Sequence, residues 1–127
     1  ENLRLVVRYH PSERNVFNPA NRVDFSPLSE PIATLLHAVD VVVVTASTVG
    51  LEAALSGRPV ISVDLSVFTP DTQYSAMGIS IGVTDLSELK IALNKSLASA
   101  APVMMRGQSS NSSAKNVLQV INSLLIQ

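Results

Sequence analysis

Short apolar runs alternate along this chain with segments whose apolar positions recur at helical spacing. The runs are rich in Val and Ile and show little polar alternation, as expected of parallel strands covered on both faces. The predicted strands cover 3–9, 22–25, 40–44, 60–63 and 79–83. The run of four valines that ends at Val44 is the strongest strand signal, and it predicts a strand in the middle of the sheet.

The intervening segments predict helices, because their apolar residues are spaced by three and four positions. The predicted helices cover 31–39, 49–56, 72–77, 85–98 and 114–125, and 107–113 is a predicted hinge or helix start. Ser29 is the expected N-cap of the first, with Pro31 just inside it. Asp85 and Glu88 have capping-box spacing, and Gly57 is placed to end the second helix.

This alternation of strands and helices predicts an α/β fold: a doubly wound, Rossmann-like parallel sheet with helices on both faces. The length of 127 residues fits a single domain, 1–127. In such sheets ligands bind beyond the carboxyl ends of the strands. The segments that follow the strands are therefore where binding residues are expected.

Composition narrows the function classes. Hydrophobic residues make up 46% of the chain, which excludes a disordered protein. Nine basic and ten acidic residues give a net charge of −1, so nucleic-acid binding is not expected. There is no cysteine, and no His, Asp and Glu spacing suggests a metal site. The apolar runs are far shorter than the roughly 20 residues of a membrane span, so no transmembrane segment is expected.

The segment after the valine run carries the clearest candidate chemistry. Its small residues let a ligand approach the backbone, and the following helix start offers N–H donors and a positive dipole to an anion such as a phosphate. It lacks the lysine of a Walker loop and the glycines of a GxGxxG fingerprint. The candidate binding residues at this edge are His10, Ser47, Thr48, Val49, Gly50, Glu52 and Asp64.

The block DVVVVTASTVGLEAALSGRPVISVD, residues 40–64, resembles the C-terminal nucleotide-binding half of GT-B-fold glycosyltransferases and of UDP-N-acetylglucosamine 2-epimerases. The opening VVRYHP, residues 6–11, resembles the strand-His-Pro segment of capsule and cell-wall polysaccharide transferases. Together with GISIGVTDLSEL, residues 78–89, the similarity covers most of 3–97. The resemblance implies a domain that binds a nucleotide diphosphate sugar, with a UDP-sugar as the expected donor and no cofactor.

Carried over to this chain, the resemblance implies that Ser47 and Thr48 contact the donor phosphates and that Glu52 accepts hydrogen bonds from the ribose. His10 is placed for phosphate contact or proton transfer. The acceptor site and the usual catalytic base belong to an N-terminal half, which this chain lacks, so the isolated domain is expected to bind without turnover. The chain begins at Glu1 without a methionine and enters a strand at once, which also suggests a domain cut from a longer cytoplasmic protein, any membrane association arising from its other parts.

Other interpretations remain open. Ser47 and Thr48 can simply cap a helix, and Glu52 can be an ordinary carboxylate on a helix surface. The epimerase pattern has Ser-Gly-Gly where this chain has Ala46-Ser47-Thr48, so a transferase fits better. The third alternative is a non-catalytic α/β interaction module.

Overall fold

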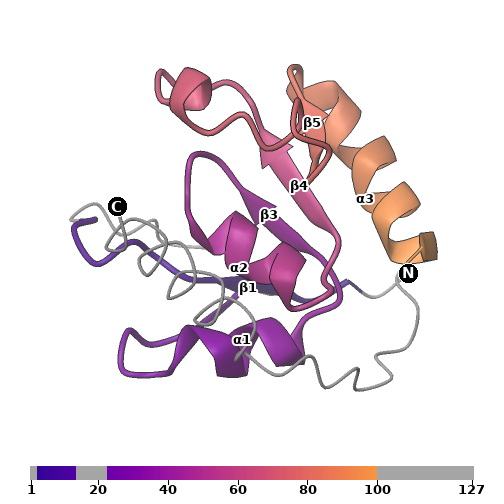
Figure 1. Ribbon diagram of the computed structural model, residues 1–127. Helices are drawn as coiled ribbons and strands as arrows, with labels where there is room; N and C mark the ends of the chain where they lie inside the picture. Colours follow the sequence, from indigo (N-terminus) through magenta and orange to yellow (C-terminus); the bar gives the residue numbers. More distant parts are fainter. Residues whose placement is uncertain (1–2, 14–22, 100–127) are drawn as a thin grey trace, which may run out of the picture.

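The structure is a computed structural model that describes residues 3–13 and 23–99 (Figure 1). Its strands are β1 (Leu5–Val7), β2 (Val23–Phe25), β3 (Val42–Val44), β4 (Val60–Val63) and β5 (Ile81–Val83). Its helices are α1 (Ile32–Ala38), α2 (Val49–Leu55) and α3 (Leu89–Ser99), with short 3-10 turns η1 (Thr69–Asp71) and η2 (Leu86–Glu88). Each predicted strand is present, usually shorter than its apolar run. The predicted hinge at 107–113 and helix at 114–125 lie outside the described residues.

The strands are parallel, and they form two sheets in the described part of the chain. β1 pairs with β2 in one sheet, and β4 lies between β3 and β5 in the other. The α/β class with parallel strands is therefore confirmed. The central position predicted for the valine run is wrong: β3 is an edge strand of its ladder, and Val43 is 45% exposed. The central strand is β4, in which Val60, Ile61 and Ser62 are all buried.

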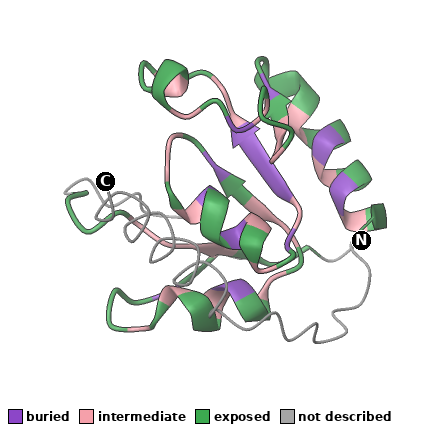
Figure 2. Cartoon of the chain, in the orientation of Figure 1, coloured by how far each residue is buried: buried purple, intermediate pink, exposed green. Residues whose placement is uncertain are grey.

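Helices cover both faces of the three-stranded sheet (Figure 1). On one face Leu36 of α1 and Ala53 of α2 pack in a cluster with Val44 and Val60. On the other face Ala92 of α3 packs against Ile61 and Val83. Figure 2 shows this buried centre running along β4 between the two helical layers. β4 contributes residues to both clusters because successive side chains of a strand point to opposite faces of the sheet.

The helix ends test the predicted caps. Pro31, and not Ser29, is the N-cap of α1, and no side chain caps that end. Asp85 caps η2 as predicted, since its carboxylate accepts from Ser87 N–H at 2.8 Å. This bond lowers the pKa of the exposed Asp85 carboxyl. Gly57 follows the C-cap of α2 with φ of 76°, the left-handed conformation expected of a terminating glycine.

The short helix predicted at 72–77 is absent, and turns occupy this segment. The carbonyl of Tyr74 accepts from the N–H of Ile79 at 2.8 Å, and Gly78 has φ of 71°. The chain therefore reverses after a single turn and enters β5 directly, because the left-handed glycine stops helical propagation.

Arg58 is buried. In the sequence it stands out only as part of the Gly-Arg-Pro run that ends a helix. Its Nε donates to the carbonyl of Leu36 and its Nη2 to that of His37, both at 2.8 Å. These are carbonyls of the last turn of α1, where a positive charge also interacts favourably with the negative end of the helix dipole. Arg58, at the entry to β4, therefore ties the end of α1 to the three-stranded sheet.

Candidate functional site

All of the predicted binding residues follow the carboxyl ends of strands. His10 comes after β1, Ser47 to Glu52 follow β3 and open α2, and Asp64 follows β4. Because β3 and β4 are paired in parallel, the last two groups lie at the same edge of one sheet. β1 belongs to the other sheet, and no hydrogen bond among the described residues joins His10 to the other candidates.

The amino end of α2 separates the roles of Ser47 and Thr48. Ser47 Oγ accepts from Val49 N–H at 3.2 Å, and its carbonyl accepts from Gly50 N–H at 3.0 Å. Ser47 is therefore the capping residue. Thr48 occupies the N-cap position, but its hydroxyl makes no capping bond, and its side chain is exposed.

The backbone N–H groups at the start of α2 fall into two groups, those with an acceptor and those without one in the described residues. The N–H groups from Val49 to Glu52 all have acceptors within the segment. Among the described residues, no hydrogen bond uses the N–H of Ser47 or of Thr48. Within the described residues, these two amides and the hydroxyl protons of Ser47 and Thr48 are thus donors that no hydrogen bond uses.

Glu52 lies in the first turn of α2 and is exposed. Its backbone closes the first turn, since its N–H donates to the carbonyl of Thr48 at 3.2 Å. An exposed carboxylate at this place interacts favourably with the helix dipole and can accept two hydrogen bonds from vicinal hydroxyls. Its ribose-binding role stays a prediction.

Gly50 is buried, and the ring of Tyr74 occupies the space beside its Cα. A Cβ at this position would lie 3.0 Å from Val44 Cγ2 and 3.1 Å from Tyr74 Cε2. Tyr74 comes from the loop after β4, so the missing side chain lets this loop pack against α2. Val49 is half-buried and packs against the cluster around Leu36. Both residues thus have packing roles, and their ligand contacts remain predictions.

Asp64 holds the loop after β4 against the sheet. Its Oδ2 accepts from Ser75 Oγ at 2.7 Å, and its N–H donates to the carbonyl of Val83 at 2.8 Å. Gly82 of β5 lies close to this carboxylate: a Cβ at Gly82 would be 2.6 Å from Asp64 Oδ2. The geometry gives Asp64 a structural role at the edge where a binding role is predicted.

His10 is exposed, and in the described part of the chain its imidazole ring contacts Ser12. Nδ1 accepts from the backbone N–H of Ser12 at 3.2 Å and lies 2.6 Å from Ser12 Oγ. A backbone N–H can only donate, so Nδ1 is the acceptor and the neutral ring carries its proton on Nε2. The imidazole therefore offers an N–H donor from Nε2, just beyond β1. Ser12 escaped the sequence analysis, although its position after His10-Pro11 is typical of a turn.

Replacing Ser12 by Ala is expected to loosen this tautomer, because Nδ1 loses the closer hydroxyl at 2.6 Å and keeps only the 3.2 Å bond from the backbone N–H. Nitrogen chemical shifts of the imidazole, recorded at a pH where the ring is neutral, measure the two tautomers. We expect the intact protein to give the pattern of a single Nε2–H form and the Ser12→Ala variant to give averaged shifts. Ser29→Ala is the control. An intact protein that already shows averaged shifts would contradict this assignment.

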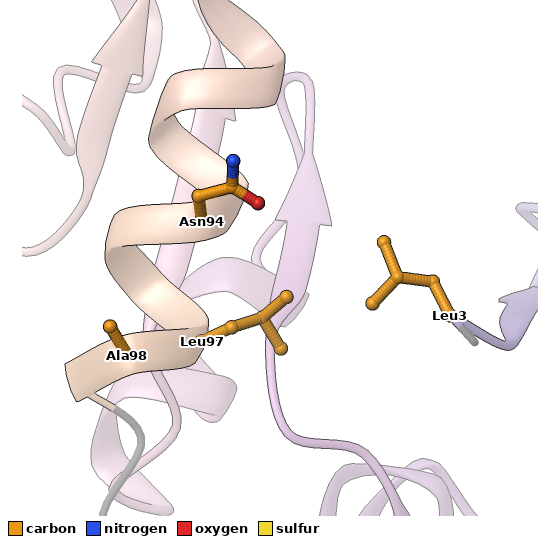
Figure 3. Close-up of a pocket in the computed structure, with 4 residues that line it drawn as sticks. All are labelled: Leu3, Asn94, Leu97 and Ala98. Atoms are coloured by element: carbon orange, nitrogen blue, oxygen red, sulfur yellow. The ribbon is translucent and has the colours of Figure 1, made fainter. Parts of the chain in front are cut away.

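A concavity lies at the opposite edge of the described residues. A hollow of about 460 Å³ is lined by Leu3, Asn94, Leu97 and Ala98 (Figure 3). It lies between the segment that enters β1 and the last turns of α3. Its one polar side chain, Asn94, offers little chemistry, so it does not add to the candidate site.

Within 3–13 and 23–99, no cluster of His, Cys, Asp and Glu could hold a metal ion. No helix in those ranges is long and apolar enough to cross a membrane. Comparisons of the chain with protein-family models, with curated proteins and with solved structures found no match. The function is therefore inferred from the site and from the residues that form it.

Proposed function

We propose that this chain is the donor-binding domain of a GT-B-like glycosyltransferase, which moves a sugar from a nucleotide diphosphate sugar to a glycan or lipid acceptor. The proposal includes a doubly wound arrangement of the strands and a cytoplasmic setting. One observation carries it: at the start of α2, no hydrogen bond within the described residues uses the amides of Ser47 and Thr48 or the Thr48 hydroxyl. An anion at this place would find these donors at the positive end of a helix.

The other residues take complementary roles in this proposal. The exposed Glu52 carboxylate accepts from the ribose hydroxyls, one turn along α2 from the phosphates. The Nε2–H of His10 donates to a phosphate oxygen. Gly50 and Asp64 shape the wall between α2 and the loop after β4, where their packing contacts lie. Val49 holds the start of α2 against the cluster around Leu36. UDP is the expected leaving group.

These groups would act on the leaving diphosphate. Transfer of the sugar breaks the bond to the diphosphate, and negative charge grows on the departing oxygen. Hydrogen-bond donors fixed in advance stabilise that charge more than water does, because they need no reorganisation. In this proposal the base that activates the acceptor comes from the N-terminal half.

A titration of the chain with UDP, GDP, CDP and ADP, followed by amide chemical shifts, tests the proposal. We expect saturable shifts at 47–52 with one of the diphosphates. Thr48→Val should weaken that affinity about tenfold, since a hydrogen bond to a charged group contributes about 1.5 kcal/mol. Glu52→Gln should also weaken it. Thr34→Val and Glu88→Gln, at exposed positions of α1 and η2, are the matched controls and should leave the affinity unchanged.

The alternatives predict different results. A non-catalytic interaction module gives no saturable amide shifts with any of the diphosphates, and Thr48→Val does not change this result. An epimerase half binds UDP as a transferase half does. It is distinguished in the full-length enzyme by epimerisation or hydrolysis of the nucleotide sugar without an acceptor.

A further inference from the structure

The side chain of Tyr74 combines a buried ring with a hydroxyl that no hydrogen bond within the described residues uses. Tyr74 is 8% exposed, and the hydrogen bonds that it makes in that part of the chain are those of its backbone. A buried tyrosine usually pairs its O–H with a partner, because a phenol that leaves water without one loses free energy. The Tyr74 hydroxyl is therefore a hydrogen-bond donor that a ligand can use.

The hydroxyl end of this ring lies at the start of α2. A Cβ on Gly50 would be 3.1 Å from Tyr74 Cε2 and 3.3 Å from Cδ2. Cε2 is bonded to the carbon that carries the hydroxyl, so the outer edge of the ring faces the first turn of α2. The same point is 3.0 Å from Cγ2 of Val44, the last residue of β3. The ring thus lies where β3 ends and α2 begins, beside the segment that carries Ser47 and Thr48.

The backbone around Tyr74 is fixed on both sides. Its N–H donates to the carbonyl of Thr72 at 2.8 Å, and its own carbonyl accepts from the N–H of Ile79 at 2.8 Å. The next residue, Ser75, donates through Oγ to Asp64 Oδ2 at 2.7 Å. A hydroxyl held in this way needs little reorganisation when a charged ligand arrives.

We propose that the Tyr74 hydroxyl donates a hydrogen bond to the diphosphate held at the start of α2, which makes Tyr74 a further binding residue of the nucleotide site. This inference rests on the proposed function and extends it, because the added group comes from the loop after β4 and not from α2. A hydrogen bond to a charged oxygen is stronger than one between neutral groups. Gly50 and Asp64 then share a positioning role: Gly50 leaves the space that the ring occupies, and Asp64 holds the residue that follows Tyr74.

Tyr74→Phe in the full chain tests this contact, because it removes the hydroxyl and keeps the ring. We expect the affinity for UDP, measured from the amide shifts at 47–52, to fall about tenfold, as for the loss of a hydrogen bond to a charged group. The midpoint of urea unfolding without ligand should stay the same, since the hydroxyl has no partner among the described residues. Tyr9→Phe is the matched control. It removes the other phenolic hydroxyl of the protein and should leave the affinity for UDP unchanged.

The outcomes separate this inference from the proposed function. Binding of UDP that Thr48→Val weakens and Tyr74→Phe does not would overturn the role of Tyr74 and leave the proposed function standing. Equal weakening by Tyr74→Phe and Tyr9→Phe would overturn it too, because the effect would not be specific to one hydroxyl. A lower urea midpoint for Tyr74→Phe would overturn it by showing that the hydroxyl bonds to the protein itself. No saturable shifts with any diphosphate would overturn both proposals.

A second measurement needs no change at Tyr74. The chain has two tyrosines, so labelling tyrosine Cζ with carbon-13 gives two resonances, and Tyr9→Phe leaves that of Tyr74 alone. We expect UDP to shift this resonance saturably, with the same midpoint as the amides at 47–52, because Cζ carries the hydroxyl that donates. A Tyr74 Cζ resonance that stays fixed while those amides saturate would overturn the inference.

Discussion

Replacing Ile61 by Ala is expected to lower the free energy of unfolding by about 3 kcal/mol, because a fully buried side chain leaves a cavity that the sheet cannot close. Ile61 is at the centre of β4 with 0% exposure, and it packs with Val83 of β5 and Ala92 of α3. A two-state urea titration measures the change. For a domain with a total stability of about 5–15 kcal/mol, this is a large fraction.

Ile91→Ala is the matched control, since Ile91 is 71% exposed on α3. We expect it to change the free energy of unfolding by no more than about 0.5 kcal/mol. Similar losses at both positions would mean that β4 is not the buried centre of the sheet.

Gly82→Ala is expected to cost about 2–3 kcal/mol, because β5 and the loop after β4 approach too closely for a methyl group. The added Cβ would lie 2.7 Å from Ser75 Cβ, an atom that cannot move without its backbone. The loop must therefore shift, and the bond between Ser75 and Asp64 is strained or lost. The same titration measures the loss, and amide shifts of Asp64 report the displacement.

Two variants isolate this cause. Gly57→Ala adds a methyl group with no atom within 4 Å, so it should cost only about 1 kcal/mol, from the left-handed φ of 76°. Adding Ser75→Gly to Gly82→Ala removes the clashing Cβ and should recover at least about 1 kcal/mol through coupling of the two sites. Strict additivity of the two substitutions would show that the clash does not determine the cost.

Some features of the candidate site follow from local sequence, and others depend on contacts between residues far apart in the chain. The position of the two hydroxyl residues at the start of α2 could be predicted from sequence, because the Ala-Ser-Thr run and the glycine of the helix are local signals. The assignment of the cap could not, since two adjacent hydroxyls have equal propensity. Backbone geometry decided it, giving the bond to Ser47 and leaving Thr48 open.

The order of elements and the parallel α/β class were determined by the sequence itself. Apolar spacing reports the local period of strand or helix, and Gly57 and Asp85 mark ends through backbone conformation and a neighbouring N–H. The tertiary structure alone decided that β4, and not the valine run, is central, that Arg58 holds the end of α1, and that Tyr74 fills the space beside Gly50. Each of these depends on residues far apart in the chain, and apolar periodicity shows which face of an element is buried without showing what packs against it.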